Sequence, residues 1–352
     1  MQLISLKEFV ESSVVLYSKS KPSDLPAVML WGQPGVGKSD SFKEIGRRLH
    51  ELTGKAVNFV DIRLLLYSPV DLKGIPTADE MKRFTKWLTP QIFNLDASDN
   101  VINIIVLDEI NAAVPSTQAC AYQITLDRKV GEAIIPDNTI IFLAGNRMTD
   151  KAVTYKMPKP LGNRATHFEV TVDFESWKEW AIRNDIDQRI ISFLSFRPGL
   201  LNTFDPKNED VVFATPRSWA MCSNYLKNLP WNMAKTYIAG TVGEGVAVEF
   251  FAYCEIYTKV PKIIDIANGV YTTPHNEPDI CYAISTGITV SVPKMNDTQL
   301  ENTLLYTRKL PPEFTTMICR DLLNNIALIP NVVKLKAWKD WIKDFNETYA
   351  KR

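Results

Sequence analysis

The chain has no excess of charge of either sign. Its 352 residues include 40 lysines and arginines and 40 aspartates and glutamates, and no run of like charge stands out. Electrostatics therefore gives no support for a tail that binds nucleic acid. No apolar run reaches the roughly 20 residues of a membrane-spanning helix. Residues 1–16 lack the basic start, the apolar stretch and the small-residue cleavage site of a signal peptide.

Side chains that bind transition metals are scarce. The five cysteines are widely scattered without a Cys-x-x-Cys pair, and the chain has three histidines. This composition argues against a zinc site. An odd number of dispersed thiols suits a reducing cytosol, so we expect a cytoplasmic protein. Cys120 lies near an acidic motif, but we expect it to be a small buried apolar side chain rather than a nucleophile.

The hydropathy pattern predicts an α/β fold for the first 170 residues. Hydrophobic residues make up 45% of the chain and charged residues 23%, as in an ordinary globular protein long enough for two or three domains. Apolar runs of strand length alternate with stretches of helical spacing, which favours a mostly parallel sheet. A helix is expected near Leu6–Tyr17. The expected strands are Ala27–Trp31, Val57–Ile62, Ile102–Leu107, Thr139–Ala144 and a weaker one at Phe168–Val172.

After Asp173 the pattern becomes helical throughout. Two stretches, 202–215 and 269–278, interrupt it. The last helix is amphipathic, and one side of it could bind a partner, but we expect that side to pack on its own domain. Its apolar residues are Leu335, Trp338, Trp341, Ile342 and Phe345.

A complete phosphate-loop motif, Gly-x-x-x-x-Gly-Lys-Ser, follows the first of these strands. It stands between an apolar strand and a helical pattern, which is the context that the motif requires; a glycine turn capping an ordinary helix is the weaker alternative. Glycines let the backbone direct N–H groups toward phosphate oxygens, and the new helix adds the positive end of its dipole. Lys38 is expected to reach the β- and γ-phosphates, and Ser39 to bind Mg²⁺. The predicted nucleotide-binding residues are Gly32, Gln33, Pro34, Gly35, Val36, Gly37, Lys38, Ser39 and Asp40.

Two later strands end in polar residues that suit ATP hydrolysis. Asp108 and Glu109 follow the apolar run 104–107. Asp108 can hold Mg²⁺ through water, and Glu109 can orient and polarise the water that attacks the γ-phosphate. Asn146 follows the strand expected at 139–144, where its amide could help to hold that water; a plain turn residue is the alternative. We therefore expect Ser39 and Asp108 as metal ligands, and ATP and Mg²⁺ as cofactors.

These three motifs, in this order and spacing, resemble those of AAA+ ATPases. Further segments resemble the MoxR-like ATPases within that superfamily, and the resemblance covers about residues 25–226. Segments 67–76 and 85–90 would begin and close an insert in the helix after the second strand. The other segments that carry the narrower resemblance are Asn111–Ala113, Leu126–Glu132, Met157–Arg164 and Ala214–Ser218.

The resemblance implies catalytic roles for two arginines besides Glu109 and Asn146. Arg164 would be an arginine finger that acts on the nucleotide of a neighbouring subunit. The family usually has a large apolar residue after this arginine, whereas here residues 165–167, Ala-Thr-His, precede Phe168. Arg217 would be a second sensor on a helical lid and would contact the γ-phosphate of its own subunit. The alternatives are a surface arginine paired with a carboxylate and packing at a helix N-terminus, respectively.

The resemblance also implies the domain organisation. It implies a parallel-sheet AAA+ α/β core at residues 1–172 with the insert at about 67–90, an all-helical lid at 173–262 and a helical C-terminal extension at 263–352. The insert would contact a partner or target, or else pack as a strand pair on its own sheet.

The function implied by the resemblance is Mg²⁺-dependent ATP hydrolysis by a hexameric ring. Such a ring would remodel a protein target or assist its assembly, together with a partner that carries a von Willebrand factor A domain. The alternative is a nucleic-acid motor subunit of a restriction system, which the balanced charge disfavours. A third class, a scaffold that binds nucleotide without hydrolysing it, is disfavoured by the presence of both Asp108 and Glu109.

Overall fold

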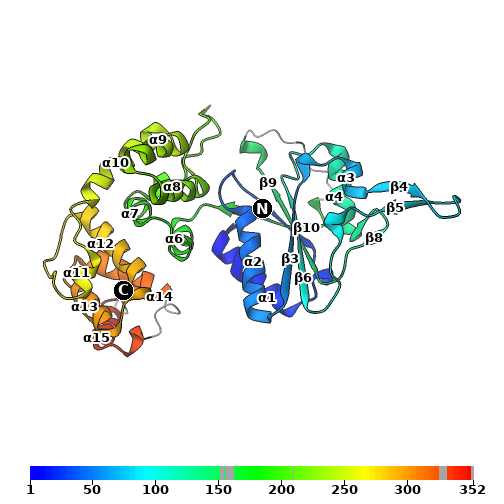
Figure 1. Cartoon of the computed structure of the whole chain (residues 1–352). Coiled ribbons are helices and arrows are strands. Elements are labelled where there is room, and N and C mark those ends of the chain that lie inside the picture. Colours follow the sequence, from blue (N-terminus) through cyan, green and yellow to red (C-terminus); the bar gives the residue numbers. More distant parts are fainter. Residues whose placement is uncertain (151–154, 156–161, 209, 325–330, 350–352) are drawn as a thin grey trace. The chain divides into compact units, whose positions relative to one another are not determined.

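The computed structural model describes residues 1–150, 155, 162–208, 210–324 and 331–349. Its contacts divide the chain into two compact units, with the change between Asp173 and Phe174 (Figure 1). The first unit is α/β and the second is helical. The domain boundaries derived from the sequence, at 172/173 and 262/263, stay predictions.

The first unit contains a six-stranded sheet in which all neighbouring strands are parallel. From one edge to the other the strands are β1 (Gln2–Ser5), β10 (Ala165–Thr171), β2 (Ala27–Trp31), β9 (Thr139–Gly145), β6 (Val101–Asp108) and β3 (Ala56–Arg63). The predicted α/β fold with a parallel sheet is therefore confirmed. Strand β1 was not predicted, because four residues directly before a helix carry too short a pattern to reveal a strand.

Both faces of this sheet are covered, and successive residues of each strand belong to opposite cores. On one face Leu30, Ile104 and Phe142 pack with helices α1 (Leu6–Lys19) and α2 (Lys38–Thr53). On the other face the alternate strand residues pack with α3 (Pro69–Lys73) and α4 (Pro115–Leu126). Burial on both faces explains why these strands are continuous apolar runs rather than alternating ones.

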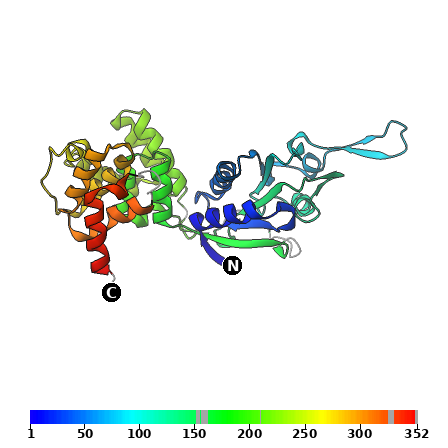
Figure 2. The ribbon, with the colours of Figure 1, turned by 90° about the horizontal axis from the view of Figure 1, so that it is seen from below.

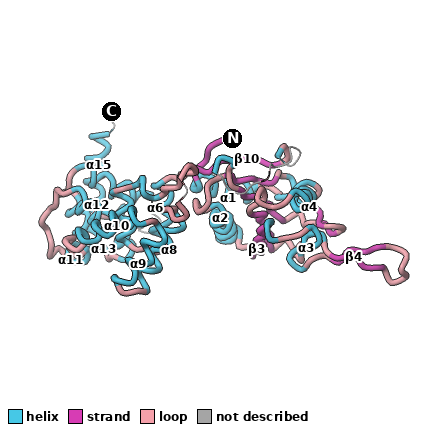
Figure 3. Tube along the Cα trace, turned by 90° about the horizontal axis from the view of Figure 1, so that it is seen from above, coloured by secondary structure: helices cyan, strands magenta, loops and turns pink. Residues whose placement is uncertain are grey.

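The insert forms a two-stranded antiparallel hairpin, β4 (Ile75–Ala78) and β5 (Thr85–Leu88), that stands out from the α/β unit (Figures 2 and 3). The two strands pair with each other and not with the six-stranded sheet. Ile75, Met81, Phe84 and Leu88 are exposed. The alternative of a strand pair packed on its own sheet is therefore wrong. A second, smaller hairpin precedes β9 and consists of β7 (Lys129–Val130) and β8 (Ala133–Ile134).

The second unit has two hydrophobic cores. Its helices are α6 (Phe174–Arg183), α7 (Gln188–Phe196), α8 (Pro216–Asn228), α9 (Trp231–Val242), α10 (Glu244–Tyr257), α11 (Ile263–Ala267), α12 (Pro278–Ser291), α13 (Asp297–Thr307), α14 (Pro312–Asn324) and α15 (Lys336–Tyr349). Short 3₁₀ helices lie at Pro22–Asp24, Leu64–Leu66, Gln91–Phe93, Met148–Asp150, Pro198–Leu201, Val292–Lys294 and Val332–Lys334. None of the described helices is long and apolar enough to cross a membrane.

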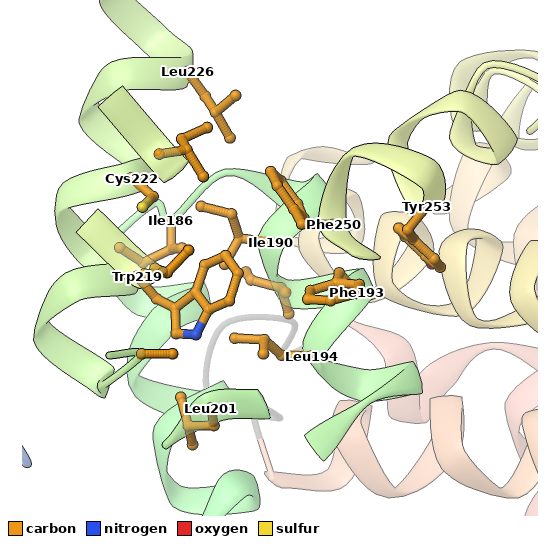
Figure 4. Close-up of a cluster of buried hydrophobic side chains, with 14 of the residues drawn as sticks. Ile186, Ile190, Phe193, Leu194, Leu201, Trp219, Cys222, Leu226, Phe250 and Tyr253 are labelled. Atoms are coloured by element: carbon orange, nitrogen blue, oxygen red, sulfur yellow. The ribbon is translucent and has the colours of Figure 1, made fainter. Parts of the chain in front are cut away.

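The first of these cores is centred on Phe193, whose ring lies 5.7 Å from that of Trp219, 5.3 Å from that of Phe250 and 5.6 Å from that of Tyr253, measured between centroids (Figure 4). The second core contains Trp338 and Trp341 of α15. Leu335 and Ile342 pack against the same core, which confirms that this part of the apolar side is buried in its own unit; the side chain of Phe345 lies outside the described residues.

The cysteine side chains lie inside the two units. All five cysteines are buried and free. Burial raises the pKa of the Cys120 thiol, although the positive charge of Lys73 opposes the shift. A raised pKa leaves less thiolate at neutral pH, so the expected role of Cys120 as a small buried side chain agrees with its surroundings.

Truncating Phe193 to alanine should destabilise the helical unit by about 3–5 kcal/mol, because the ring is fully buried and its neighbours cannot fill the space. The measurement is urea unfolding followed by near-ultraviolet circular dichroism. Met221→Ala, on the exposed side of α8, is the matched control and should change the free energy of unfolding by less than about 1 kcal/mol. Equal effects of the two substitutions would contradict the assignment of Phe193 to the centre of this core.

Candidate nucleotide site

The phosphate loop lies between the end of β2 at Trp31 and the start of α2 at Lys38. Gly35 and Gly37 have φ angles of 78° and 102°, in the left-handed region that other residues avoid. The N–H group of Gly32 donates to the carbonyl of Gly145 over 3.2 Å, which ties the loop to the end of β9. Gly35 and Gly37 therefore occupy positions where the backbone conformation itself favours glycine.

Lys38 is buried, with 8% of its surface exposed, and its ammonium group donates to oxygens of three residues named below, among other interactions. Nζ donates to the carbonyls of Gly32 at 2.7 Å and Gln33 at 3.0 Å, and to Oδ1 of Asn146 at 3.2 Å. A buried charge is stable only with such partners. The predicted lysine and the predicted sensor amide are thus brought together although 108 residues separate them in sequence.

The two predicted metal ligands are in direct contact. The hydroxyl of Ser39 donates to Oδ2 of Asp108 over 2.6 Å, and Oδ1 of Asp108 accepts from the N–H of Glu109 at 2.8 Å. Hydroxyl and carboxylate oxygens are the hard donors that Mg²⁺ prefers. The described residues include no group of three His, Cys, Asp or Glu side chains that could hold a metal on their own. The hydroxyl of Ser39 and the carboxylate of Asp108 are donors that fit Mg²⁺.

The acidic pair lies in a local distortion at the end of β6. Leu107 pairs with Leu143 of β9, but the next backbone contact between the two segments is from Ile110 N–H to the carbonyl of Ala144, at 3.0 Å. Asp108 still pairs with Arg63 of β3, so the ladder with β9 is out of step by one residue at Glu109. Glu109 has φ of +55°, which is uncommon for a residue other than glycine. Bulges and strained residues of this kind are concentrated at functional sites.

Asn111 positions the sensor segment, a role that the sequence did not reveal. It is buried, its Nδ2 donates to the carbonyl of Asn146 at 2.7 Å, and its Oδ1 accepts from the N–H of Asn146 at 3.2 Å. A Cβ at Gly145 would lie 2.6 Å from that Oδ1, so only glycine fits there. The signal available in the sequence was an amide two residues after the acidic pair.

Asp61 on β3 is a further carboxylate near the acidic pair. Partial burial raises its pKa, and the negative charge of Asp108 raises it further, against the positive charges of Arg63 and Lys43. In the sheet Asp61 pairs with Val106, two residues before Asp108. Nothing in its local sequence distinguishes it, because the proximity arises from the pairing of β3 with β6.

Other loop residues differ in exposure. Val36 is buried in the core beneath the loop, whereas Gln33 and Pro34 are half-buried. Asp40 is exposed in the first turn of α2, with Lys43 at 3.9 Å. The role of Asp40 at a nucleotide stays a prediction.

Arg164 lies at the amino ends of the strands, whereas the phosphate loop lies at their carboxyl ends. It directly precedes β10, whose first residue, Ala165, pairs with Ala27, the first residue of β2. The loop follows the other end of β2, and five residues of strand separate the two ends by about 16 Å. Arg164 is therefore not brought together with Lys38 of its own chain.

The guanidinium group of Arg164 lies 5.7 Å from the ring centroid of Tyr122. The side chain lines a cavity of about 260 Å³ together with Tyr17 and Arg128. Arg164 is exposed, and its role at a neighbouring nucleotide stays a prediction. Most of the segment predicted to present this arginine, residues 157–161, lies outside the described residues.

Arg217 belongs to the helical unit. It lies in the first turn of α8, where Thr215 and Ser218 form a capping box and Pro216 occupies the first position. Its neighbours Pro216 and Ser218 are buried, whereas Arg217 itself is exposed. Packing at this helix end is thus provided by its neighbours, and the sensor role of Arg217 stays a prediction.

Comparisons with known proteins find structural resemblance at low sequence identity. No family model matches the chain, and no curated protein matches it. Among solved structures, a putative ATPase from Cytophaga hutchinsonii is 13% identical with a TM-score of 0.35, and the match covers 90% of this chain and 80% of that one. A mutant RuvB from Thermotoga maritima is 15% identical with a TM-score of 0.38, covering 84% and 89%. PCH-2 from Caenorhabditis elegans is 13% identical with a TM-score of 0.34, covering 69% and 64%.

Proposed function

We propose that this chain is a Mg²⁺-dependent ATPase of the AAA+ superfamily. The proposal rests on the contacts among three motifs at the carboxyl ends of neighbouring strands. Lys38 of the loop contacts Asn146, and Ser39 contacts Asp108. A loop that only capped a helix would not need a buried ammonium beside a strained acidic pair.

Each residue has a chemical role in this proposal. Lys38 leaves its carbonyl partners and binds the β- and γ-phosphates, while loop N–H groups bind phosphate oxygens. Ser39 and Asp108 would hold Mg²⁺, which when bound would offset the negative charge of the phosphate oxygens. Glu109 accepts a proton from the attacking water, and the amide of Asn146 orients that water or the γ-phosphate.

Arg164 completes the site of a neighbouring subunit. Its position at the opposite end of the strands from its own loop supports an action in trans, where the guanidinium offsets charge that develops on the transferred phosphoryl group. We infer a closed ring, a hexamer as in the MoxR-like ATPases that the sequence resembles. Arg217 then links the helical unit to the γ-phosphate of its own subunit.

The target is proposed to be a protein, remodelled or assembled with a partner that carries a von Willebrand factor A domain. The hairpin at Ile75–Leu88 supports this, because exposed Met81 and Phe84 at the end of a protruding element suit contact with another protein. The guanidinium of Arg83 lies 5.8 Å from the Phe84 ring centroid.

Replacing Glu109 by glutamine should lower the rate of ATP hydrolysis at least about 100-fold without weakening ATP binding, because the amide keeps the shape but cannot accept the proton. Replacing Lys38 by alanine should lower the rate of hydrolysis and also weaken ATP binding, with a loss of affinity of about 10- to 100-fold. Phosphate release and binding of a fluorescent ATP analogue measure the two effects. Glu51→Gln, on the exposed side of α2, is the control. Wild-type turnover by Glu109→Gln would refute the catalytic assignment.

Subunit mixing tests the trans action of Arg164. Arg164→Ala subunits keep Glu109, and Glu109→Gln subunits keep the arginine, so a mixture should recover partial turnover although each variant alone hydrolyses ATP far more slowly than the wild type. Mixing Arg164→Ala with the double variant Glu109→Gln/Arg164→Ala is the control and should recover none, because neither subunit supplies an arginine. Absence of recovery at every mixing ratio would rule out this role.

A further inference from the structure

His167 has no role in the function proposed above, yet both of its ring nitrogens are engaged. It lies on β10 between Arg164 and the end of that strand. Trp31 Nε1 lies 2.8 Å from Nδ1 of His167, and the carbonyl oxygen of Gly162 lies 2.6 Å from Nε2. The two aromatic rings are stacked, with centroids 6.0 Å apart and planes at 14°.

Hydrogen-bond chemistry fixes the direction of this chain of contacts. The indole N–H of Trp31 can only donate, so Nδ1 of His167 must accept. The proton of the neutral imidazole is then on Nε2, which donates to the Gly162 carbonyl. Both nitrogens are satisfied by a single tautomer, and the ring is held from both sides.

The two partners of His167 belong to segments with proposed catalytic roles. Trp31 is the last residue of β2 and directly precedes Gly32 of the phosphate loop. Gly162 stands two residues before Arg164. One imidazole therefore connects the segment of the arginine finger to the loop that binds the phosphates in the same subunit.

A second side chain on the same face of β10, Glu169, makes an ion pair with the segment after β9. Glu169 is two residues beyond His167, so both side chains leave the strand on one face. Its carboxylate binds Arg147 at 3.0 Å. Arg147 directly follows Asn146, whose amide contacts Lys38. Alternate residues of one strand thus reach the phosphate loop and the sensor segment.

We propose that His167 is a positioning residue that couples Arg164 to the phosphate loop of its own subunit through Trp31. Engagement of Arg164 with the neighbour's nucleotide pulls on the Gly162 segment, and the rigid ring pair transmits that displacement to the start of the loop. The inference rests on the proposed trans action of Arg164. A histidine that merely filled space beside Trp31 would stabilise the sheet without linking the two sites.

A double-mutant cycle separates coupling from simple structural support. His167→Phe keeps an aromatic ring beside Trp31 but removes both hydrogen bonds, and should lower the rate of ATP hydrolysis about 10- to 100-fold with an unchanged KM. In the Arg164→Ala background the same substitution should lower the remaining rate less than about twofold, because there is no finger to couple. If His167→Phe simply damaged the loop, the loss of rate in the double variant would be the product of the two single losses.

Two further variants distinguish loss of the contact from misfolding. Trp31→Phe removes the donor from the other side of the contact and should reproduce the pattern of His167→Phe. Thr166→Val, on the opposite face of β10, is the matched control and should leave turnover unchanged. Multiplied losses, or wild-type turnover by His167→Phe and Trp31→Phe, would overturn the coupling role alone. Wild-type turnover by Arg164→Ala would overturn the trans action of Arg164, and the coupling with it.

Discussion

The burial of the Lys38 ammonium is the constraint on which the rest of the nucleotide site depends. A buried positive charge costs several kcal/mol unless oxygen atoms surround it. Two of these oxygens are loop carbonyls, and the third belongs to Asn146 at the end of β9. The loop, the first turn of α2 and the end of β9 must therefore keep one relative position. Phosphate oxygens are stronger partners for an ammonium than neutral carbonyls, so a nucleotide can take over the same cradle.

Parallel pairing extends this constraint to the whole edge of the sheet. Strands β2, β9 and β6 are neighbours, so their carboxyl ends meet, and that is where the loop, Asn146 and Asp108 lie. A slip of one residue would exchange the two buried faces, which makes the register strongly specified. The 2.6 Å contact of Ser39 with Asp108 follows from that register. The same pairing places Arg164 at the opposite end of the strands, so the arginine of the proposed hydrolytic site would have to come from a neighbouring subunit.

The sequence predicts those parts of the site that are local in the chain. The five apolar strands, the phosphate loop and the acidic pair each have a pattern within about ten residues, and the predicted sheet is confirmed. Strand β1, the bulge at Glu109 and the contacts of Asn111 and Asp61 were not predicted. Each depends on which strand lies beside which, and a single sequence without pairing information does not contain that. Arg164 and Arg217 came from a resemblance, and their roles rest on assembly and on the relation between the two units.

The register of β10 also decides which side chains can connect the segment before Arg164 to the phosphate loop. Its residues alternate between the core shared with α1 and α2, where Val170 is buried, and the face where Ala165, His167 and Glu169 follow one another. The buried positions hold the strand still, because they pack between β1 and β2. On the polar face, His167 joins Gly162 to Trp31 at the start of the loop, and Glu169 binds Arg147 beside Asn146. A strand locked on one face and hydrogen-bonded on the other transmits a displacement at its amino end instead of absorbing it, because packed interiors do not deform continuously.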